Sequence, residues 1–122
     1  ELVKAALESI AYQISDIVSM MHEETGIQIK ELKVDGGPTR NRYLMQFQSD
    51  IMNISVAVPD VEELSVIGAA YMAGMAMKLY DGQIFNEYRY STFQPKMLEI
   101  DRAEKQRNWK NAIDLVLYKG KK

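Results

Sequence analysis

The sequence predicts a layered α/β fold in which helices pack on a small sheet. Two observations predict it: helical and strand-like patterns alternate along residues 1–80, and each predicted strand is followed by a Gly or Pro that ends it. Such alternation is typical of a sheet covered by helices. The chain has 122 residues, which is enough for one domain or for part of one.

The first predicted element is an amphipathic helix that ends at Thr25-Gly26, where Gly26 suits a left-handed C-cap. The stripe that identifies this helix is open to two interpretations, a coiled-coil seam or a face packed on a sheet. A strand pattern follows directly and favours the second. Apolar residues recur at spacings of three and four, the period of one helix face, at Val3, Leu7, Ile10, Ile14, Ile17 and Met21.

Residues 27–34 alternate apolar and polar side chains and are predicted to form a strand. The sequence Asp35-Gly36-Gly37-Pro38 then breaks the pattern. Pro38 suits the first position of a new helix, where its missing N–H is not needed, and this helix would run to about Asp50. A second strand is predicted over residues 55–58, where a proline stops it.

Residues 63–79 are predicted to form a third helix, with Glu62 and Glu63 in its first turn, where carboxylates favour the helix dipole. Its many Gly and Ala residues leave a smooth surface, so we expect it to pack closely against the sheet. Residues 81–95 are expected to be irregular. A last helix is predicted over residues 101–118, with an apolar face formed by Trp109, Ile113, Val116 and Leu117.

The composition is that of a soluble globular protein, with 47% hydrophobic and 26% charged residues. There is no cysteine, which excludes disulfides, zinc-thiolate sites and thiol catalysis and agrees with our expectation of a cytoplasmic location. The net charge of -2 does not indicate a nucleic-acid partner. The most apolar run, residues 66–77, is too short to span a membrane. The chain begins at Glu1 rather than Met, with the helical pattern already running at Val3, so we expect an excised fragment.

The candidate functional segment is the junction after Val34, where two glycines separate a strand from a helix. Glycines let the backbone approach a ligand closely, and the first N–H groups of a helix attract phosphate. Asn41, about one helical turn further on, would face the same ligand as the amides of Gly36 and Gly37. From this pattern alone, the segment is either a phosphate site or an ordinary tight turn.

Three motifs in the same order resemble the FGGY carbohydrate kinases, the family of glycerol kinase and xylulose kinase. The sequence VDGGPTRN at residues 34–41, followed by LMQFQSDI, resembles the nucleotide-binding motif of that family. ALESIAYQ at residues 6–13 resembles the helix that closes its second signature, and IGAAYMAG at residues 67–74 resembles its small-residue helix. Together these motifs cover residues 1–80 almost continuously.

The resemblance implies an actin-like, ribonuclease H-like fold, of which this chain would be the truncated carboxy-terminal lobe. In that family two lobes close over ATP and a sugar. By this resemblance Gly37 would place its N–H near the α-phosphate, Gly36 would permit the close approach, and Asn41 would contact the nucleotide. ATP and Mg²⁺ would be the cofactors of the intact enzyme. Residues 1–80 would be a partial carboxy-terminal domain, and residues 81–122 an extension with a final helix.

The same resemblance places the catalytic Asp before Glu1, so no catalytic or metal-ligating residue is assigned in this chain. Gly68 and Ala69 of the third predicted helix would either pack on the sheet or line the nucleotide cleft. Residues 63–66 depart from the Thr-rich stretch of glycerol kinases, which weakens an assignment of glycerol as the substrate. Carboxylates with no catalytic motif are interpreted as surface groups, namely Asp16, Asp50, Asp60 and Asp101.

Two functions are therefore open. The first is an enzyme part: the intact protein would transfer the γ-phosphoryl group of ATP to a small sugar or polyol, and this chain alone would be inactive. The second is a non-catalytic interaction module with a degenerate nucleotide site, in which the stripe of the first helix would be a partner surface. Truncation of the lobe would uncover part of that stripe, so we also expect self-association into a homo-oligomer. Neither function involves nucleic acid or a membrane.

Overall fold

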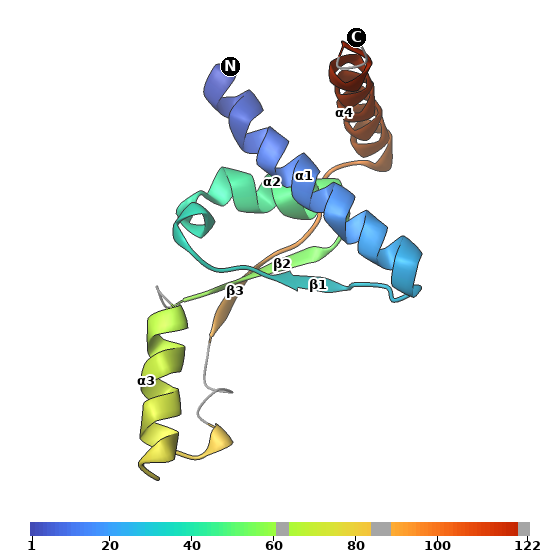
Figure 1. The fold of residues 1–122 in the computed structure, drawn as a ribbon. Helices are drawn as coiled ribbons and strands as arrows, with labels where there is room; N and C mark the ends of the chain where they lie inside the picture. Colours follow the sequence, from blue (N-terminus) through green and yellow to red (C-terminus); the bar gives the residue numbers. More distant parts are fainter. Residues whose placement is uncertain (61–63, 84–88, 120–122) are drawn as a thin grey trace.

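The computed structural model describes residues 1–60, 64–83 and 89–119. Helices and strands alternate through most of it, which confirms the predicted α/β class (Figure 1). The elements in chain order are α1 (Leu2–Thr25), β1 (Glu31–Lys33), the short 3-10 helix η1 (Gly37–Arg40), α2 (Arg42–Met52), β2 (Ser55–Pro59), α3 (Leu64–Ala76), β3 (Tyr90–Phe93) and α4 (Glu99–Lys119).

The sheet has three strands in the order β1-β2-β3. β1 pairs parallel to β2, with Leu32 opposite Val56, and β3 pairs antiparallel to β2, with Phe93 opposite the same Val56. The prediction of an irregular segment at 81–95 is therefore wrong for β3. Four residues carry too little periodicity to identify a strand, and β3 forms because β2 offers a free edge. Residues 84–88 of that segment lie outside the described residues.

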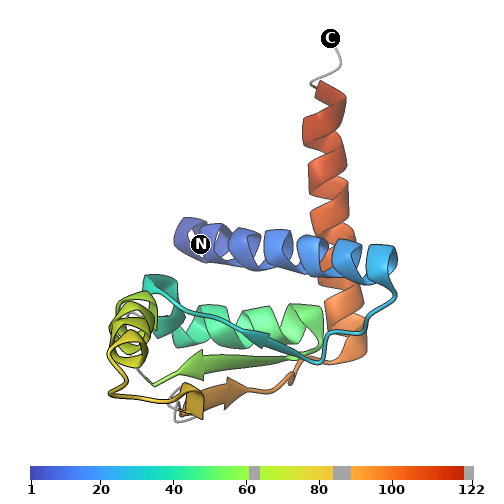
Figure 2. The same cartoon turned by 60° about the horizontal axis from the view of Figure 1, so that its bottom comes forward.

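The molecule is built around α2, which lies between α1 and the sheet (Figure 2). One face of α2 packs under α1 and the other packs on β2 and β3. A 3.6-residue period can bury two faces when the helix lies between two layers. The buried apolar core is drawn mainly from α2, and it consists of Ala11, Leu44, Met45, Phe47, Ile51 and Val56.

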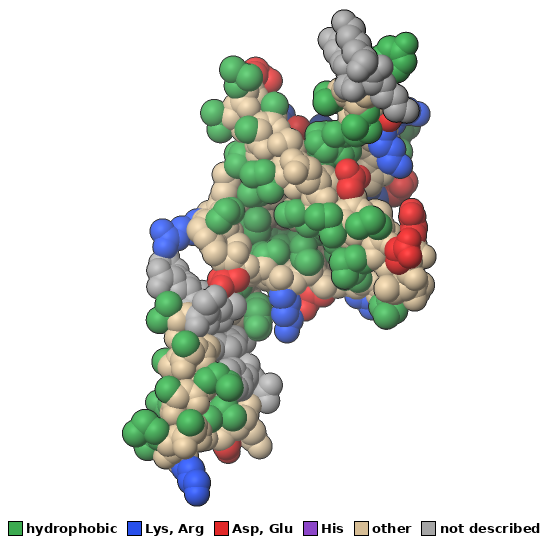
Figure 3. Space-filling model, in the orientation of Figure 1, with side chains coloured by type: hydrophobic (Ala, Val, Ile, Leu, Met, Phe, Trp, Pro, Cys, Tyr) green, Lys and Arg blue, Asp and Glu red, His purple; other side chains and the backbone are tan. Residues whose placement is uncertain are grey.

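α1 packs on α2 and not on the sheet, so the favoured interpretation of its stripe is wrong. The contact uses small residues, since Ala11 and Ser15 are the buried residues of α1. Gln48 joins the two helices by donating from Nε2 to the carbonyl of Ala11 at 3.1 Å. Much of the predicted stripe is open to solvent, with Val3 75% and Ile17 52% exposed (Figure 3). The end of the helix is as predicted, with Gly26 in the left-handed conformation at φ 69°.

α3 extends away from the sheet, so its predicted close packing there is wrong (Figure 1). Ala69, Ala70 and Ala73 are exposed, and such small side chains offer little apolar area to hold a helix on a sheet. Gly74 is buried instead against Tyr80, whose ring a methyl group at position 74 would overlap. Glu62 and Glu63 lie outside the described residues. Among the helices that the structure describes, none is both long and apolar enough to cross a bilayer.

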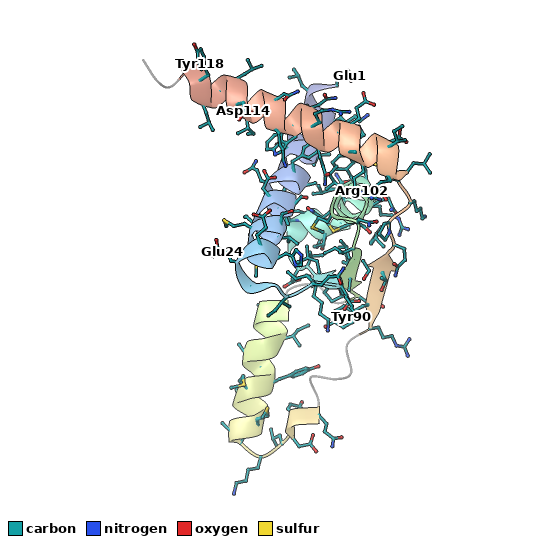
Figure 4. The ribbon with its side chains drawn as sticks, turned by 90° about the vertical axis from the view of Figure 1, so that its right-hand side faces the viewer. Glu1, Glu24, Tyr90, Arg102, Asp114 and Tyr118 are labelled. Carbon is teal, nitrogen blue, oxygen red and sulfur yellow. The ribbon has the colours of Figure 1, made fainter. Side chains whose placement is uncertain are left out.

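α4 is confirmed as a helix, but its predicted apolar face is only partly buried. The ring of Trp109 stacks on Tyr12, with centroids 5.0 Å apart, and its Nε1–H donates to Asp16 at 2.8 Å. Beyond Trp109 the helix projects past the rest of the molecule (Figures 2 and 4). Val116 is accordingly 70% exposed and Leu117 63% exposed.

A tyrosine of α2, Tyr43, links α1 to α2 by a hydrogen bond. Because of this contact, we expect the protein to lose stability at alkaline pH. Tyr43 donates from its hydroxyl to Glu8 Oε1 at 2.6 Å. Burial, and then the hydrogen bond and charge of Glu8, raise the pKa of Tyr43 above its ordinary value of 10.0. Because the folded chain holds this proton more tightly than the unfolded chain, the stabilisation is complete below about pH 10 and declines above it.

We therefore expect the free energy of unfolding to fall as the pH rises above about 10, and to fall less steeply in Tyr43→Phe. Tyr12 has a pKa raised by burial and by Glu8, so part of the slope should remain. Urea denaturation at a series of pH values measures the slope, and Tyr118→Phe, which alters an exposed tyrosine of α4, is the matched control. Equal slopes in the wild type and in Tyr43→Phe would contradict the assignment.

Candidate nucleotide-binding turn

The Gly36-Gly37 turn lies at the carboxyl end of β1, beside the carboxyl end of the parallel strand β2. In open α/β sheets, ligands bind at this edge, outside the carboxyl ends of parallel strands. Both glycines are exposed, and Asp35, the residue before them, is exposed as well. The turn is thus accessible from solvent at an edge suited to a ligand.

The backbone of the turn requires glycine at one position. Gly36 has φ 99° and ψ 176°, a region that is essentially restricted to glycine because a Cβ would clash with the backbone. Gly37 has no such requirement, and a Cβ built on it meets no atom within 4 Å. The two glycines therefore differ: the fold needs the first, and only a ligand would need the second.

The prediction that an α-helix starts at Pro38 is wrong for the first turn of that helix. Residues 37–40 form η1, a single 3-10 turn with Pro38 near its start, and α2 begins only at Arg42. The dipole of the long helix is consequently not centred on the glycines. What the turn itself offers is its amides: within residues 1–60, 64–83 and 89–119, neither Gly36 N–H nor Gly37 N–H has a hydrogen-bond acceptor.

Asn41 lies at the start of α2 rather than one turn inside a helix. It is the N-cap residue, and its side-chain Oδ1 accepts a hydrogen bond from the N–H of Leu44 at 3.1 Å. Its own N–H donates to the carbonyl of Pro38 at 3.1 Å, and the residue is half-buried. The structure thus brings Asn41 into the same short segment as the glycines but gives its oxygen a structural partner, which leaves Nδ2 as the group that would contact a nucleotide.

The other polar side chains that the sequence offers as candidates lie away from the Gly36-Gly37 turn. His22 is exposed at the end of α1, where its Nδ1 is 2.9 Å from the carbonyl oxygen of Ile27. The cavity of about 270 Å³ lined by Tyr12, Asp16 and Trp109 lies between α1 and α4 and does not include the turn. In the part of the chain that the structure describes, no three His, Asp or Glu side chains converge as a metal site would require.

Thr39 is a residue of the turn that the sequence pattern did not identify. Its N–H and its hydroxyl both donate to the carbonyl oxygen of Gly36, at 3.1 and 2.7 Å. A Thr three residues after a turn residue can close such a loop by bonding back to the main chain, and this local pattern could have identified it. Thr39 belongs to the turn as a structural element.

The chain matches the FGGY family of carbohydrate kinases, C-terminal domain, over residues 1–77. Curated relatives include the glycerol kinase of Pseudothermotoga lettingae, 45% identical over 115 residues, and that of Petrotoga mobilis, 44% identical over 116 residues. The alignments cover 92% and 93% of this chain and 23% of each relative. The chain therefore spans about a quarter of the length of these relatives.

Solved structures of the same family share the fold. A crystal structure of Plasmodium falciparum glycerol kinase with ADP matches 92% of this chain and 23% of its own, with a TM-score of 0.77 and 34% identity. A xylulose kinase from Lactobacillus acidophilus matches 88% of this chain and 22% of its own, with a TM-score of 0.68 and 16% identity, which shows the fold alone. The predicted actin-like fold class is thus confirmed, and the chain belongs to the FGGY family of carbohydrate kinases, with sequence from that family's carboxy-terminal domain.

Proposed function

We propose that the complete protein is an ATP-dependent carbohydrate kinase and that this chain supplies part of its ATP site, at Gly36, Gly37 and Asn41. The observation that carries the proposal is the pair of open amides at a strand end in a chain of this family. Peptide N–H groups bind phosphate oxygens well, and Gly37 has the space for one to approach. The similar Plasmodium falciparum enzyme is a glycerol kinase with ADP, which is consistent with a nucleotide at this domain.

The chain's own part in phosphoryl transfer would be positioning. Its amides would hold the nucleotide while a second lobe brings the acceptor, because in-line transfer depends on alignment and charge stabilisation. ATP would arrive as its Mg²⁺ complex, so the metal is part of the substrate. Closure of the two lobes would exclude water, which would otherwise compete with the acceptor hydroxyl.

We propose glycerol as the first acceptor to test. The sequence of residues 63–66 departs from that of glycerol kinases. However, the relatives at 44–45% identity are glycerol kinases, and their alignments cover nine-tenths of the chain, which is stronger evidence than four residues.

We also propose a division after residue 80, with an extension whose β3 and α4 pack on the preceding domain. We further propose a cytoplasmic location, which is consistent with the lack of cysteine.

The replacement Gly37→Ala tests the ATP site. The turn has room for the methyl group, so the stability should hardly change, whereas a phosphate at the amide would meet that methyl group. In the complete protein we expect the dissociation constant for ATP to rise by about tenfold or more, an effect near 1.4 kcal/mol. Isothermal titration with ATP measures it. The control is Gly82→Ala, an exposed glycine that also has open space around it; unchanged affinity in Gly37→Ala would remove the assignment.

A second candidate, the non-catalytic interaction module, is favoured by one observation: the α1 stripe is largely exposed, as Val3 and Ile17 show. Its homo-oligomer would form along that stripe. The same titration separates the two candidates, since a degenerate site would bind no ATP even in the wild-type protein.

A further inference from the structure

The carbonyl of Gly36 is held by two hydrogen bonds from one residue. Thr39 donates to it from its N–H at 3.1 Å and from its hydroxyl at 2.7 Å. The shorter of the two comes from the side chain, so it depends on which residue stands at position 39. Thr39 is half-buried and lies in η1, two residues after Gly37.

These bonds also determine where the N–H of Gly37 points. The Gly36 carbonyl and the Gly37 N–H belong to one planar trans peptide, in which C=O and N–H point in opposite directions. If the carbonyl is held towards Thr39, the N–H must point away from η1. Gly36 has no side chain to restrict rotation of this peptide, so the restriction has to come from a hydrogen bond.

We infer that Thr39, through its hydroxyl, is a positioning residue for the Gly37 amide in the proposed phosphate-binding turn. The inference rests on the proposed function. Thr39 acts through the Gly36–Gly37 peptide, holding one donor in the direction in which a phosphate oxygen would accept it. A donor aligned in advance binds more tightly, because the ligand need not restrict the peptide itself.

The experiment compares Thr39→Val with Thr39→Ser in the complete protein. Valine keeps the shape and the backbone donor but removes the hydroxyl, whereas serine keeps the hydroxyl. We expect Thr39→Val to raise the dissociation constant for ADP and the KM for ATP by roughly three- to tenfold, as expected for the loss of one hydrogen bond. Thr39→Ser should stay within about twofold of the wild type, and the KM for glycerol should not change in either variant.

The outcomes separate this inference from the proposed function. If Gly37→Ala weakens ADP binding and Thr39→Val does not, the positioning role is wrong and the nucleotide site stands. If neither variant weakens binding, the nucleotide site itself is wrong. If Thr39→Val raises the KM values for ATP and glycerol alike, Thr39 supports only the fold. The same conclusion follows if a lower Tm accounts for the whole loss of affinity. Rescue by Thr39→Ser with the effect confined to the nucleotide supports the inference.

Discussion

Replacing Gly36 with alanine should weaken ATP binding by the complete protein by about 10- to 100-fold. Gly36 has φ 99° and ψ 176°, where a residue with a side chain is strained by roughly 1–3 kcal/mol. Alanine would relieve that strain by rotating the backbone, so the turn seen here would become a minor conformation. Affinity falls in proportion to the population of the competent conformation. Titration with ATP measures the loss.

The matched control is Gly26→Ala. Gly26 also has a positive φ, 69°, and also has open space around its Cα, but it caps the far end of α1. Alanine there should lower the free energy of unfolding by about 1 kcal/mol and leave ATP binding unchanged. If Gly26→Ala and Gly36→Ala reduced ATP affinity equally, the effect would come from lost stability, and the special role of the Gly36 conformation would be refuted.

The second large effect concerns Arg102, which anchors α4 to the end of α2 (Figure 4). Arg102 is only 6% exposed. Its Nε donates to the carbonyl of Asp50 at 2.8 Å, its Nη2 donates to the carbonyl of Met97 at 3.0 Å, and its Nη1 pairs with Glu99. One buried guanidinium thus satisfies carbonyl groups from two segments that are distant in the sequence.

We expect Arg102→Met to lower the free energy of unfolding by about 2–4 kcal/mol, because two partly buried carbonyls lose their donors and the ion pair with Glu99 is lost. Urea denaturation of the 122-residue chain measures the change. Arg107→Met is the matched control on the same helix: Arg107 is exposed, so its replacement should change stability by less than about 0.5 kcal/mol. A loss below about 1 kcal/mol in Arg102→Met would contradict the anchoring role, given typical values for single hydrogen bonds.

Asp50 completes this anchor. The prediction that Asp50 is a surface carboxylate is therefore wrong. Its Oδ1 accepts hydrogen bonds from the N–H groups of Lys96 and Met97, at 2.6 and 3.2 Å, and from Gln46 Nε2 at 3.0 Å. The residue is half-buried. The donors from the main chain lie more than forty positions away, so no local pattern around Asp50 could have revealed them.

The sequence by itself determined the features that depend on a few neighbouring residues. Helix periodicity and Gly26 located α1 and its end, and the Val-Asp-Gly-Gly junction located the turn and led to the family. Local chemistry decides these features because caps, turns and helices form through contacts between residues close in the chain. The start of α2 was misplaced for a local reason as well, since Asn41 is a better N-cap than the position before Pro38.

Only the tertiary structure decided which surfaces meet. The small contact at Ala11 places α1 on α2, β3 joins the sheet because β2 has a free edge, and Arg102 holds α4 against α2. Each contact joins segments far apart in the chain, and an apolar stripe indicates that a face can be buried without indicating its partner. The direction of the Gly37 amide is likewise decided by the tertiary structure. The pair of glycines is visible in the sequence, but the peptide plane takes a defined orientation only when its hydrogen bonds form.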